Sequence, residues 1–327
     1  MRVPDSRIVP KVLFVTSNRI GDCVISSGII REIARQVPGA RITVACGRPP
    51  APFFRAAPDV ERVIILDKKK AAGHWFGLWK QVVGTRWDLV IDLRGSALGY
   101  LIPTRRRVIY NRSWETGVRK VEVVSRLMGA STPLEPEIFL DEQSRADRQA
   151  VLAPQLAGGS GPGPILALAP IAHQPGKSWP ADRWGELVER LKAEPRFDGW
   201  RFMAVGGPGD RAPATPALEA AGPRGIDFVG KGDILASAAA IDVADLFVGN
   251  DSGLMHVAAA LGRPTLGLFG PTEWWLYGPW GATTRTVASN ETRGAFAPIE
   301  ALSVDQVFAA VLALHADFIA SPGPGAP

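Results

Sequence analysis

The sequence predicts an α/β protein built from two Rossmann-like, doubly wound domains that face a central cleft. Short apolar, β-branched segments alternate with helical ones, which is typical of parallel sheets. The alternation starts again after residues 156–164, LAGGSGPGP, the stretch inside the chain that is richest in Gly, Pro and Ser. A length of 327 residues also suits about two domains of ordinary size. We therefore expect an N-terminal domain over 1–157 and a C-terminal domain over 158–327.

In the first half, short apolar runs that end in polar residues or glycine predict buried parallel strands. A helix over 23–37 is expected from the spacing of its apolar residues, and it stops at Pro38-Gly39. A second helix is expected over 74–83. The four expected strands span residues 11–17, 41–47, 60–66 and 88–95.

The second half repeats this architecture, although not its sequence. Its expected strands span residues 164–170, 200–207, 245–251 and 264–270. A helix over 182–193 begins with an Asp cap, and a short helix of small residues is expected over 253–261. A last amphipathic helix covers about 303–319, and packing back on the N-terminal domain is one option for it. The tail 321–327, SPGPGAP, is expected to be disordered.

Composition limits the class of protein. Hydrophobic residues make up 46% and charged residues 21%, which excludes wholesale disorder. The 35 Gly and 28 Pro show no period, which excludes a collagen-like chain. Two cysteines give neither a disulfide framework nor a zinc pattern, as expected in a reducing compartment. Without a signal peptide or a run of roughly 18 apolar residues, we expect a cytoplasmic protein, peripheral on a membrane surface.

The net charge of +5 is unevenly distributed. Residues 1–157 hold 25 basic and 15 acidic side chains, a net of +10, whereas residues 158–327 hold 12 and 17, a net of −5. This asymmetry indicates that the N-terminal half meets a polyanion. A sequence pI of about 9.4 also admits nucleic-acid binding, but no nucleic-acid motif accompanies the charge, so we expect no nucleic acid.

The first chemical motif is SNRIGDCV, residues 17–24, at the end of the first expected strand. Gly21 permits a tight turn, and the following helix offers backbone amides to an anion. Asp22 falls at the helix start, where two interpretations compete. It is either an N-cap, worth about 1 kcal/mol, or a general base for an acceptor hydroxyl. No GxGxxG is present, so a dinucleotide fingerprint is unsupported.

Two further motifs belong to the second half. Lys177 lies in a loop after an expected strand, where it is either a solvated lysine or a point charge for a diphosphate. His173 in the same loop is a possible second donor, although a loop histidine is more often ordinary surface. The turn VGGPGDR, with Gly206, Gly207 and Asp210, resembles a nucleotide-binding turn whose acid holds ribose hydroxyls, but on its own it is also a simple loop.

Residues 249–275, GNDSGLMHVAAALGRPTLGLFGPTEWW, are the most informative stretch. Strand, polar turn, small-residue helix and second strand follow one another closely. The backbone amides of Ser252, Gly253 and Leu254 can meet a phosphate at the helix N-terminus. Asp251 is better placed for sugar hydroxyls. One turn into the helix, Met255 is expected in the core, and His256 is assigned to the donor side.

With these four motifs in order, the chain resembles glycosyltransferase family 9, the ADP-heptose:lipopolysaccharide heptosyltransferases. The carrying segments are RIGDCVISSGIIREIARQVPGARITV, GKSWPADRWGELVERL, VGGPGDR and GNDSGLMHVAAALGRPTLGLFGPTE. The resemblance covers about the first 45 residues and most of the C-terminal half, and about 50–155 only in outline. It implies a GT-B fold, with the acceptor on the N-terminal domain and the ADP-sugar on the C-terminal one.

The resemblance also implies the roles of particular residues in an inverting, metal-independent transfer. Asp22 would be the catalytic base, and Lys177 would neutralise the diphosphate. Asp210 would hold the ribose and Asp251 the sugar or diphosphate. The chain departs from the family at residues 171–174, Ile-Ala-His-Gln, where some members carry hydroxyl groups, and at the bulky Glu-Trp-Trp of 273–275. No metal and no cofactor beyond the nucleotide-sugar donor is implied.

On the acceptor side, the basic excess is either a solvated positive face or a surface for anionic lipid and phosphorylated core sugar. Lys68–Lys70 precede an aromatic stretch in which Trp75 and Trp79 are expected at the membrane interface. The residues assigned to the acceptor are Arg19, Gly21, Arg105, Arg106, Arg107, Arg112, Arg119 and Lys120.

The expected partners are therefore an ADP-sugar donor, a phosphorylated lipid-linked saccharide and the anionic inner face of the inner membrane. Two alternatives stay open. One is transfer of another nucleotide-activated sugar to another glycan by the same residues. The other is a non-catalytic sugar-nucleotide-binding protein, which would need neither a base at Asp22 nor a cation at Lys177.

Overall fold

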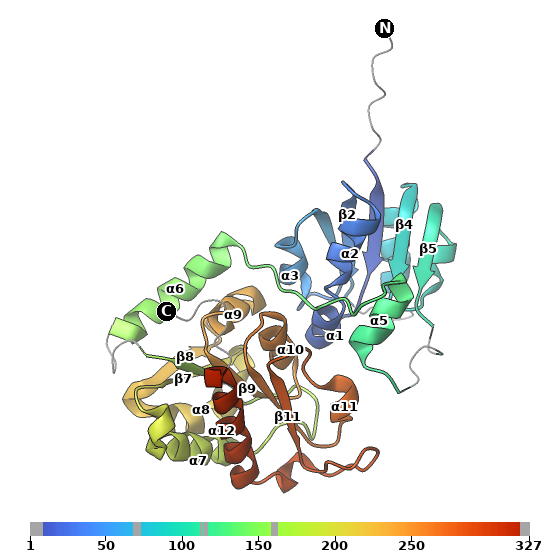
Figure 1. Cartoon of the computed structure of the whole chain (residues 1–327). Helices are drawn as coiled ribbons and strands as arrows, with labels where there is room; N and C mark the ends of the chain where they lie inside the picture. Colours follow the sequence, from blue (N-terminus) through green and yellow to red (C-terminus); the bar gives the residue numbers. More distant parts are fainter. Residues whose placement is uncertain (1–8, 68–72, 112, 114–116, 158–162, 321–327) are drawn as a thin grey trace. The chain divides into compact units, whose positions relative to one another are not determined.

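The computed structural model describes residues 9–67, 73–111, 113, 117–157 and 163–320 (Figure 1). The chain divides into two compact units, Met1–Phe139 and Leu140–Pro327, each holding one parallel sheet. Two parallel sheets, whose strands alternate with helices along the chain, confirm the predicted α/β fold class. The division follows Phe139, whereas the sequence placed the boundary at 157. Most of the predicted linker, residues 158–162, and the tail 321–327 lie outside the described residues.

The first unit contains a five-stranded sheet of order β3-β2-β1-β4-β5, with every pair parallel. Its strands are β1 (Lys11–Val15), β2 (Arg41–Cys46), β3 (Val60–Ile65), β4 (Trp87–Asp92) and β5 (Thr104–Ile109). Its helices are α1 (Ile20–Ile25), α2 (Ile29–Gln36), α3 (Ala51–Arg55), α4 (Gly73–Val82), the 3₁₀ turn η2 (Ala97–Tyr100) and α5 (Lys120–Met128).

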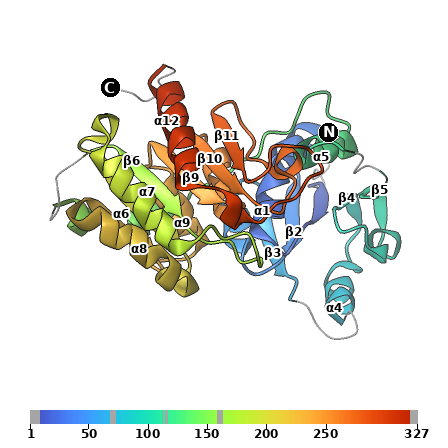
Figure 2. The same cartoon turned by 90° about the horizontal axis from the view of Figure 1, so that it is seen from below.

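The core of this unit lies on both faces of the sheet. Along β1, Val12 and Phe14 pack with α2 and α5 on one face. Leu13 and Val15 alternate with them and pack against α4 on the other. Figure 2 shows α4 and α5 on opposite sides of β4 and β5. A strand covered on both faces explains why β1 is a continuous apolar run with no polar alternation.

The single helix expected over 23–37 is two helices, α1 and α2, separated at residues 26–28. The hydroxyl of Ser26 donates to the carbonyl of Asp22 at 3.0 Å and ends the first helix. A side chain at Gly28 would clash with the backbone of Glu135, so the chain passes closely there. The prediction of one helix was wrong because the chain breaks at residues 26–28, where the local Ser26 bond is combined with the close approach of Gly28 to Glu135, a residue distant in sequence.

The second unit contains a six-stranded parallel sheet of order β11-β10-β9-β6-β7-β8. Its strands are β6 (Ile165–Ala169), β7 (Arg201–Gly206), β8 (Gly225–Val229), β9 (Leu246–Asn250), β10 (Thr265–Phe269) and β11 (Thr284–Ala288). Its helices are α6 (Glu142–Ala157), α7 (Ala181–Ala193), α8 (Arg211–Ala221), α9 (Ile234–Ile241), α10 (Gly253–Ala260), α11 (Trp274–Tyr277) and α12 (Val304–Ala320), with 3₁₀ turns η4 (Pro195–Phe197), η5 (Pro208–Asp210), η6 (Gly222–Arg224) and η7 (Ile299–Ala301).

The main core of the second unit lies under α7 and α12. Trp184 of α7 and Val307 of α12 pack in one buried cluster with Leu266 and Leu268 of β10. Gly267 lies between these two leucines and faces the other way, where a side chain would clash with Met255 of α10. The last helix therefore packs within the second unit. Of the described helices, none is long and apolar enough to cross a membrane.

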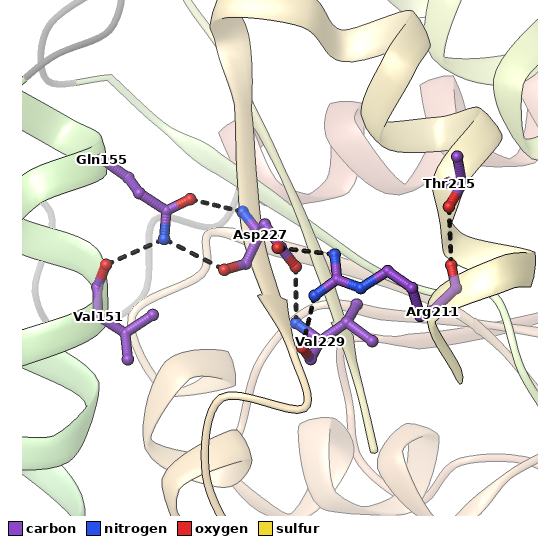
Figure 3. A network of polar contacts seen from close by, with 6 residues as sticks. All are labelled: Val151, Gln155, Arg211, Thr215, Asp227 and Val229. Atoms are coloured by element: carbon purple, nitrogen blue, oxygen red, sulfur yellow. Dashed lines mark hydrogen bonds and ion pairs between the residues drawn. The ribbon is translucent and has the colours of Figure 1, made fainter. Parts of the chain in front are cut away.

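Helix α6 is fastened to the edge strand β8 by the side chain of Gln155 (Figure 3). The Gln155 amide accepts from the backbone N–H of Asp227 at 2.7 Å and donates to its carbonyl at 3.1 Å. The Asp227 carboxylate in turn accepts from Arg211 of α8 at 2.7 Å. An unpaired sheet edge is thus covered, which accounts for the place of α6 in the second unit.

We expect Gln155→Ala to lower the free energy of unfolding by about 1–3 kcal/mol, because two backbone groups of the edge strand lose their partner. Urea denaturation followed by tryptophan fluorescence measures this change. Gln143→Ala is the matched control on the same helix, since Gln143 is exposed and bonds only Asp147 among the described contacts. Equal effects of the two substitutions would contradict the structural role of Gln155.

Candidate functional site

Both sheets have a point at which the strand order reverses. In the first unit the chain leaves β1 for β2 on one side and reaches β4 on the other, and in the second unit β6 lies between β7 and β9. Loops diverge at the carboxyl ends of such strands and leave a crevice where ligands bind. The predicted site residues Asp22, Lys177 and Asp251 all follow the strands at these two points.

Asp22 lies in the first turn of α1, but it does not cap the helix. The N-cap is Arg19, and no side chain caps this helix. The Asp22 carboxylate accepts from Ser17 Oγ at 3.0 Å, and its other oxygen lies 3.9 Å from Lys120 Nζ. About one third of the Asp22 side chain is exposed (33%), and it lines a pocket of about 240 Å³ with Lys120 and Tyr110. The carboxylate is therefore open to a ligand, as a general base requires.

In the second unit, Lys177 and Asp251 form an ion pair with 2.6 Å between Nζ and Oδ2. Their side chains are only 16% and 8% exposed. Thr272 donates its hydroxyl to the same carboxylate oxygen at 2.7 Å. The loops after β6, β9 and β10 are thus joined at the reversal point of this sheet. A shielded ammonium is a stronger partner for a phosphate than a solvated one, because local screening is weaker.

Beside this pair, Ser252 is the N-cap of α10 in an extended conformation, with Gly253 and Leu254 as the first two helical residues. Ser252 makes no side-chain cap, so the first amides of the helix are left for another acceptor. Among the described residues, Ser252 Oγ and Asn250 Nδ2 are buried atoms without a hydrogen-bond partner. This end of the sheet has the donors and the helix dipole that an anion needs.

Asp210 has a partner inside its own turn. Its carboxylate accepts from the backbone N–H of Gly207 at 2.8 Å. Any residue larger than glycine at position 206 would clash with the Asp210 side chain. The residue is buried, with 6% exposed, and His173 Nε2 lies 3.7 Å from its second oxygen. Asp210 thus stabilises the glycine turn, and its ribose role stays a prediction. His173 itself is exposed, as the ordinary interpretation of a loop histidine expected.

Met255 and His256 are both buried in α10, with 0% and 7% exposed. Core packing of Met255 is confirmed, since it lies against Gly267 of β10. His256 lies one turn below the helix N-terminus, behind Ser252–Leu254. Its donor-side assignment stays a prediction.

Neither cysteine is a candidate nucleophile. Burial raises the pKa of the Cys23 thiol well above its usual range, although Cys23 adjoins Asp22 in the chain. Burial also raises the pKa of Cys46 to about 12. Since only the thiolate is strongly nucleophilic, both groups are inert at neutral pH.

The three consecutive arginines Arg105–Arg107 do not form one basic cluster, because they lie on strand β5. Side chains alternate along a strand, so Arg106 faces away from the other two. Arg106 donates to Gln36 of α2 at 2.9 Å, whereas the Arg107 guanidinium lies 5.3 Å from the Tyr100 ring centre. Arg105 pairs with Asp88 at the amino end of β4. Arg105 and Arg106 are therefore remote from the carboxyl edge of this sheet, where Asp22 lies.

The remaining acceptor candidates have different surroundings. Arg19 is exposed at the start of α1, next to Gly21, and Lys120 lies beside Asp22. Arg119 is the N-cap of α5, and burial lowers the pKa of its guanidinium. Arg112 and Lys68–Lys70 lie outside the described residues.

Four residues that the sequence did not single out belong to these two regions: Ser17, Arg48, Arg94 and Thr272. Ser17 and Thr272 are the hydroxyl donors to Asp22 and Asp251. Arg48 and Arg94 follow β2 and β4 at the same edge as Asp22. Arg48 directly follows the predicted strand 41–47, and Arg94 lies at the end of the predicted strand 88–95. These positions were the available signal, because the carboxyl ends of parallel strands share one edge.

Comparison with known proteins gives a family match. The sequence model of "Glycosyltransferase family 9 (heptosyltransferase)" matches residues 94–296. Lipooligosaccharide heptosyltransferase 2 of Haemophilus influenzae is 24% identical over 295 residues, which cover 80% of this chain and 84% of that protein. Lipopolysaccharide heptosyltransferase 1 of Pseudomonas aeruginosa is 28% identical over 302 residues, covering 80% of this chain and 79% of that protein.

Solved structures show the same fold. Escherichia coli heptosyltransferase WaaC with ADP superposes with a TM-score of 0.71 at 20% identity, covering 93% of this chain and 99% of that chain. This likeness agrees with the predicted GT-B class and its two Rossmann-like sheets. The family model, which spans more than half of this chain, carries the assignment beyond the fold.

Proposed function

The chain belongs to glycosyltransferase family 9, and we propose that it moves a heptose from ADP-heptose to an inner-core lipopolysaccharide acceptor, with inversion at the anomeric carbon. The names of the relatives, which are lipopolysaccharide or lipooligosaccharide heptosyltransferases, support the substrate class. The observation that carries the proposal is the shielded Lys177–Asp251–Thr272 group at the reversal point of the second sheet. A cation in that position suits a diphosphate leaving group.

On the acceptor side, we propose Asp22 as the general base. Its carboxylate takes the proton of an acceptor hydroxyl, and the oxygen then attacks the anomeric carbon while the bond to the diphosphate breaks. The Ser17 hydroxyl fixes one carboxylate oxygen at 3.0 Å. The other oxygen, 3.9 Å from Lys120 Nζ, would take the proton.

On the donor side, ADP departs with the electron pair of the broken bond and needs positive charge. Lys177 would supply it, with the backbone amides of Ser252–Leu254 as additional donors. Asp251 would orient Lys177 and, through its carboxylate, hold sugar hydroxyls, since a carboxylate repels phosphate. Because these groups neutralise the leaving group, the proposed transfer is metal-independent, and no cofactor besides the donor is required.

We also propose that the first unit binds an anionic membrane, at the inner face of the inner membrane. The supporting surface contains Phe76, Tyr100 and Leu101, which are 57%, 64% and 62% exposed. Trp79 stacks on Phe76 and donates to the Leu101 carbonyl at 3.1 Å, which makes the surface continuous. Lys80 lies 4.5 Å from the Phe76 ring centre and adds positive charge. Apolar side chains flanked by cations suit anionic headgroups.

The expected interfacial residues Trp75 and Trp79 are instead half-buried against the core under α4, and Phe76 is the exposed aromatic. We expect the double variant Tyr100→Ser, Leu101→Ser to reduce co-sedimentation with phosphatidylglycerol vesicles several-fold. Without these two side chains, less apolar surface is buried when the protein binds the membrane. Phe296→Ser, at an exposed phenylalanine of the second unit, is the control. Wild-type sedimentation of the double variant would exclude this surface.

The transfer itself is tested by incubating the enzyme with ADP-heptose and a truncated Kdo–lipid A acceptor. A product heavier than the acceptor by one heptose supports the proposal, and anomeric analysis of that product reads inversion or retention. ADP released without a heavier acceptor would contradict the proposed acceptor.

Thermal-shift measurements with ADP-, GDP- and UDP-sugars distinguish ADP-heptose from another nucleotide-sugar as the donor. A true donor raises the melting temperature by mass action. A non-catalytic sugar-nucleotide-binding protein would show the same shift but form no product. Preference for a GDP- or UDP-sugar would replace ADP-heptose while keeping the roles of Asp22 and Lys177.

A further inference from the structure

The loop between β6 and α7, residues 170–180, carries Lys177, and we call it the Lys177 loop. It starts beside β9, because β6 and β9 are neighbours and Ala169 pairs with Gly249. The next residue after Gly249 is Asn250, the last residue of β9, which is completely buried. The role of Lys177 alone does not explain why a polar side chain is buried there.

Asn250 holds the backbone of the Lys177 loop. Its Oδ1 atom accepts from the backbone N–H of Trp179 at 3.0 Å. The Trp179 side chain is itself fixed, because its indole Nε1 donates to the Leu302 carbonyl at 2.8 Å and its ring packs edge-on against Trp184. Trp179 thus connects the loop to the core of the second unit, and Asn250 fixes the backbone at the point where the loop leaves this core.

Ser178 ties the two ends of the loop together. Its hydroxyl accepts from the backbone N–H of Ala172 at 3.1 Å and donates to the carbonyl of the same residue at 3.0 Å. Residues 172–178 therefore form a closed ring, and the bond from Trp179 to Asn250 attaches this ring to the end of β9. Lys177 lies within the ring, one residue before Ser178.

Asn250 and Asp251 are consecutive residues that contact two different parts of this loop. Asp251 pairs with the ammonium of Lys177 at 2.6 Å, and Asn250 accepts from the backbone two residues further along. A lysine ammonium ends a flexible four-carbon side chain, so its position is well defined only when the backbone that carries it is also fixed. The end of β9 therefore fixes both the ammonium and the backbone from which it extends.

Stability does not account for an asparagine at this position. Because Oδ1 must face the Trp179 N–H, the orientation of the amide is set and Nδ2 is a donor on its other side. Among the described residues, this buried Nδ2 has no hydrogen-bond partner, which is destabilising. A leucine would remove that unpaired donor and leave another, the Trp179 N–H, so the number of unpaired donors would not change. What asparagine adds is a fixed position for the loop.

From these contacts we propose that Asn250 is a positioning residue for Lys177. Through the Trp179 backbone it holds the ammonium in the place where the diphosphate of the donor binds. This inference rests on the proposed diphosphate role of Lys177 and deepens it. Because Asn250 acts through that side chain, it contributes to ADP binding only while Lys177 is present.

Isothermal titration of the full chain with ADP tests this dependence in a double-mutant cycle of Asn250→Leu and Lys177→Met. We expect Asn250→Leu alone to raise the dissociation constant of ADP by about fivefold, because a looser loop must be ordered when the ligand binds. In the double variant, ADP affinity should stay within about twofold of that of Lys177→Met alone. Adenosine, which lacks phosphate, should bind equally to all four proteins.

Val311→Ala is the matched control, because Val311 is a buried residue of α12 in the same core. It should lower the melting temperature at least as much as Asn250→Leu, for which we expect less than about 5 °C, and leave ADP affinity within about twofold of wild type. Independent, multiplicative weakening of ADP binding in the double variant would overturn the proposal, because Asn250 would then act without Lys177. Unchanged ADP affinity in Asn250→Leu would overturn it as well.

Hydrogen exchange of the peptide that spans residues 170–180 tests the loop without any ligand. It should be at least about fivefold faster in Asn250→Leu and close to wild type in Val311→Ala. If Asn250→Leu does not fold, Asn250→Ala removes the same acceptor without added bulk and takes its place. A wild-type protein that binds no ADP would contradict the proposed function, whereas faster exchange in the variant would still support the attachment of the loop by Asn250. Unchanged exchange would refute that attachment.

Discussion

Asp22→Asn should lower the turnover number by about 100-fold or more, while donor affinity changes little. Asparagine keeps the shape of the carboxylate and can still accept from Ser17, but it cannot take a proton from the acceptor hydroxyl. Initial rates of ADP release with saturating donor and acceptor measure the effect. The variant protein is checked by mass spectrometry for deamidation, which would restore aspartate.

Two measurements separate loss of the base from damage to the fold. Asp22 is not a helix cap, and Lys120, which pairs with it, lies 3.9 Å away and is partly exposed. We therefore expect the free energy of unfolding of Asp22→Asn to stay within about 1 kcal/mol of wild type. Ser17→Ala keeps the base but loses its hydrogen bond, so its turnover should fall less. Near-normal turnover of Asp22→Asn would remove Asp22 from the mechanism.

The central strands could be predicted from sequence because their residues are buried on both faces and read as apolar runs. Among the edge strands of the two described sheets, β3 was predicted, whereas β5, β8 and β11 were missed. Strand β5 reads TRRRVI, and its three arginines were interpreted as a charged cluster. Charged residues on an edge strand protect it from pairing with another chain. The same charges replace the apolar pattern by which a strand is predicted from sequence.

The candidate site was predictable where chemistry follows a strand end. Asp22, Lys177 and Asp251 were found this way, and the structure joins the last two directly. Their hydroxyl partners were not, because Thr272 lies 21 residues from Asp251 and no local pattern connects them. At Asp210 the sequence pattern predicted a carboxylate that binds ribose. In the structure this carboxylate accepts a hydrogen bond from the backbone N–H of Gly207.

Replacement of Lys177 should abolish tight binding of ADP. Lys177→Met removes the shielded ammonium, and we expect the dissociation constant of ADP to rise by at least about tenfold, the loss of one charge-assisted contact to the diphosphate. Adenosine, which lacks phosphate, should bind equally to the wild type and the variant. Isothermal titration with both ligands measures the difference, and Lys231→Ala, at an exposed lysine of the same unit, is the control.

This substitution also leaves the Asp251 carboxylate buried with the Thr272 hydroxyl as its hydrogen-bond donor. Breaking a buried ion pair costs about 3–5 kcal/mol of stability. The double variant Lys177→Met, Asp251→Asn removes that unpaired charge and should regain most of the lost stability. If weak ADP binding came from unfolding, the double variant would recover it. If the cation itself binds the diphosphate, ADP binding stays weak while the fold is restored. Unchanged ADP affinity in both variants would refute the diphosphate role, because Lys177 would then be only the structural partner of Asp251.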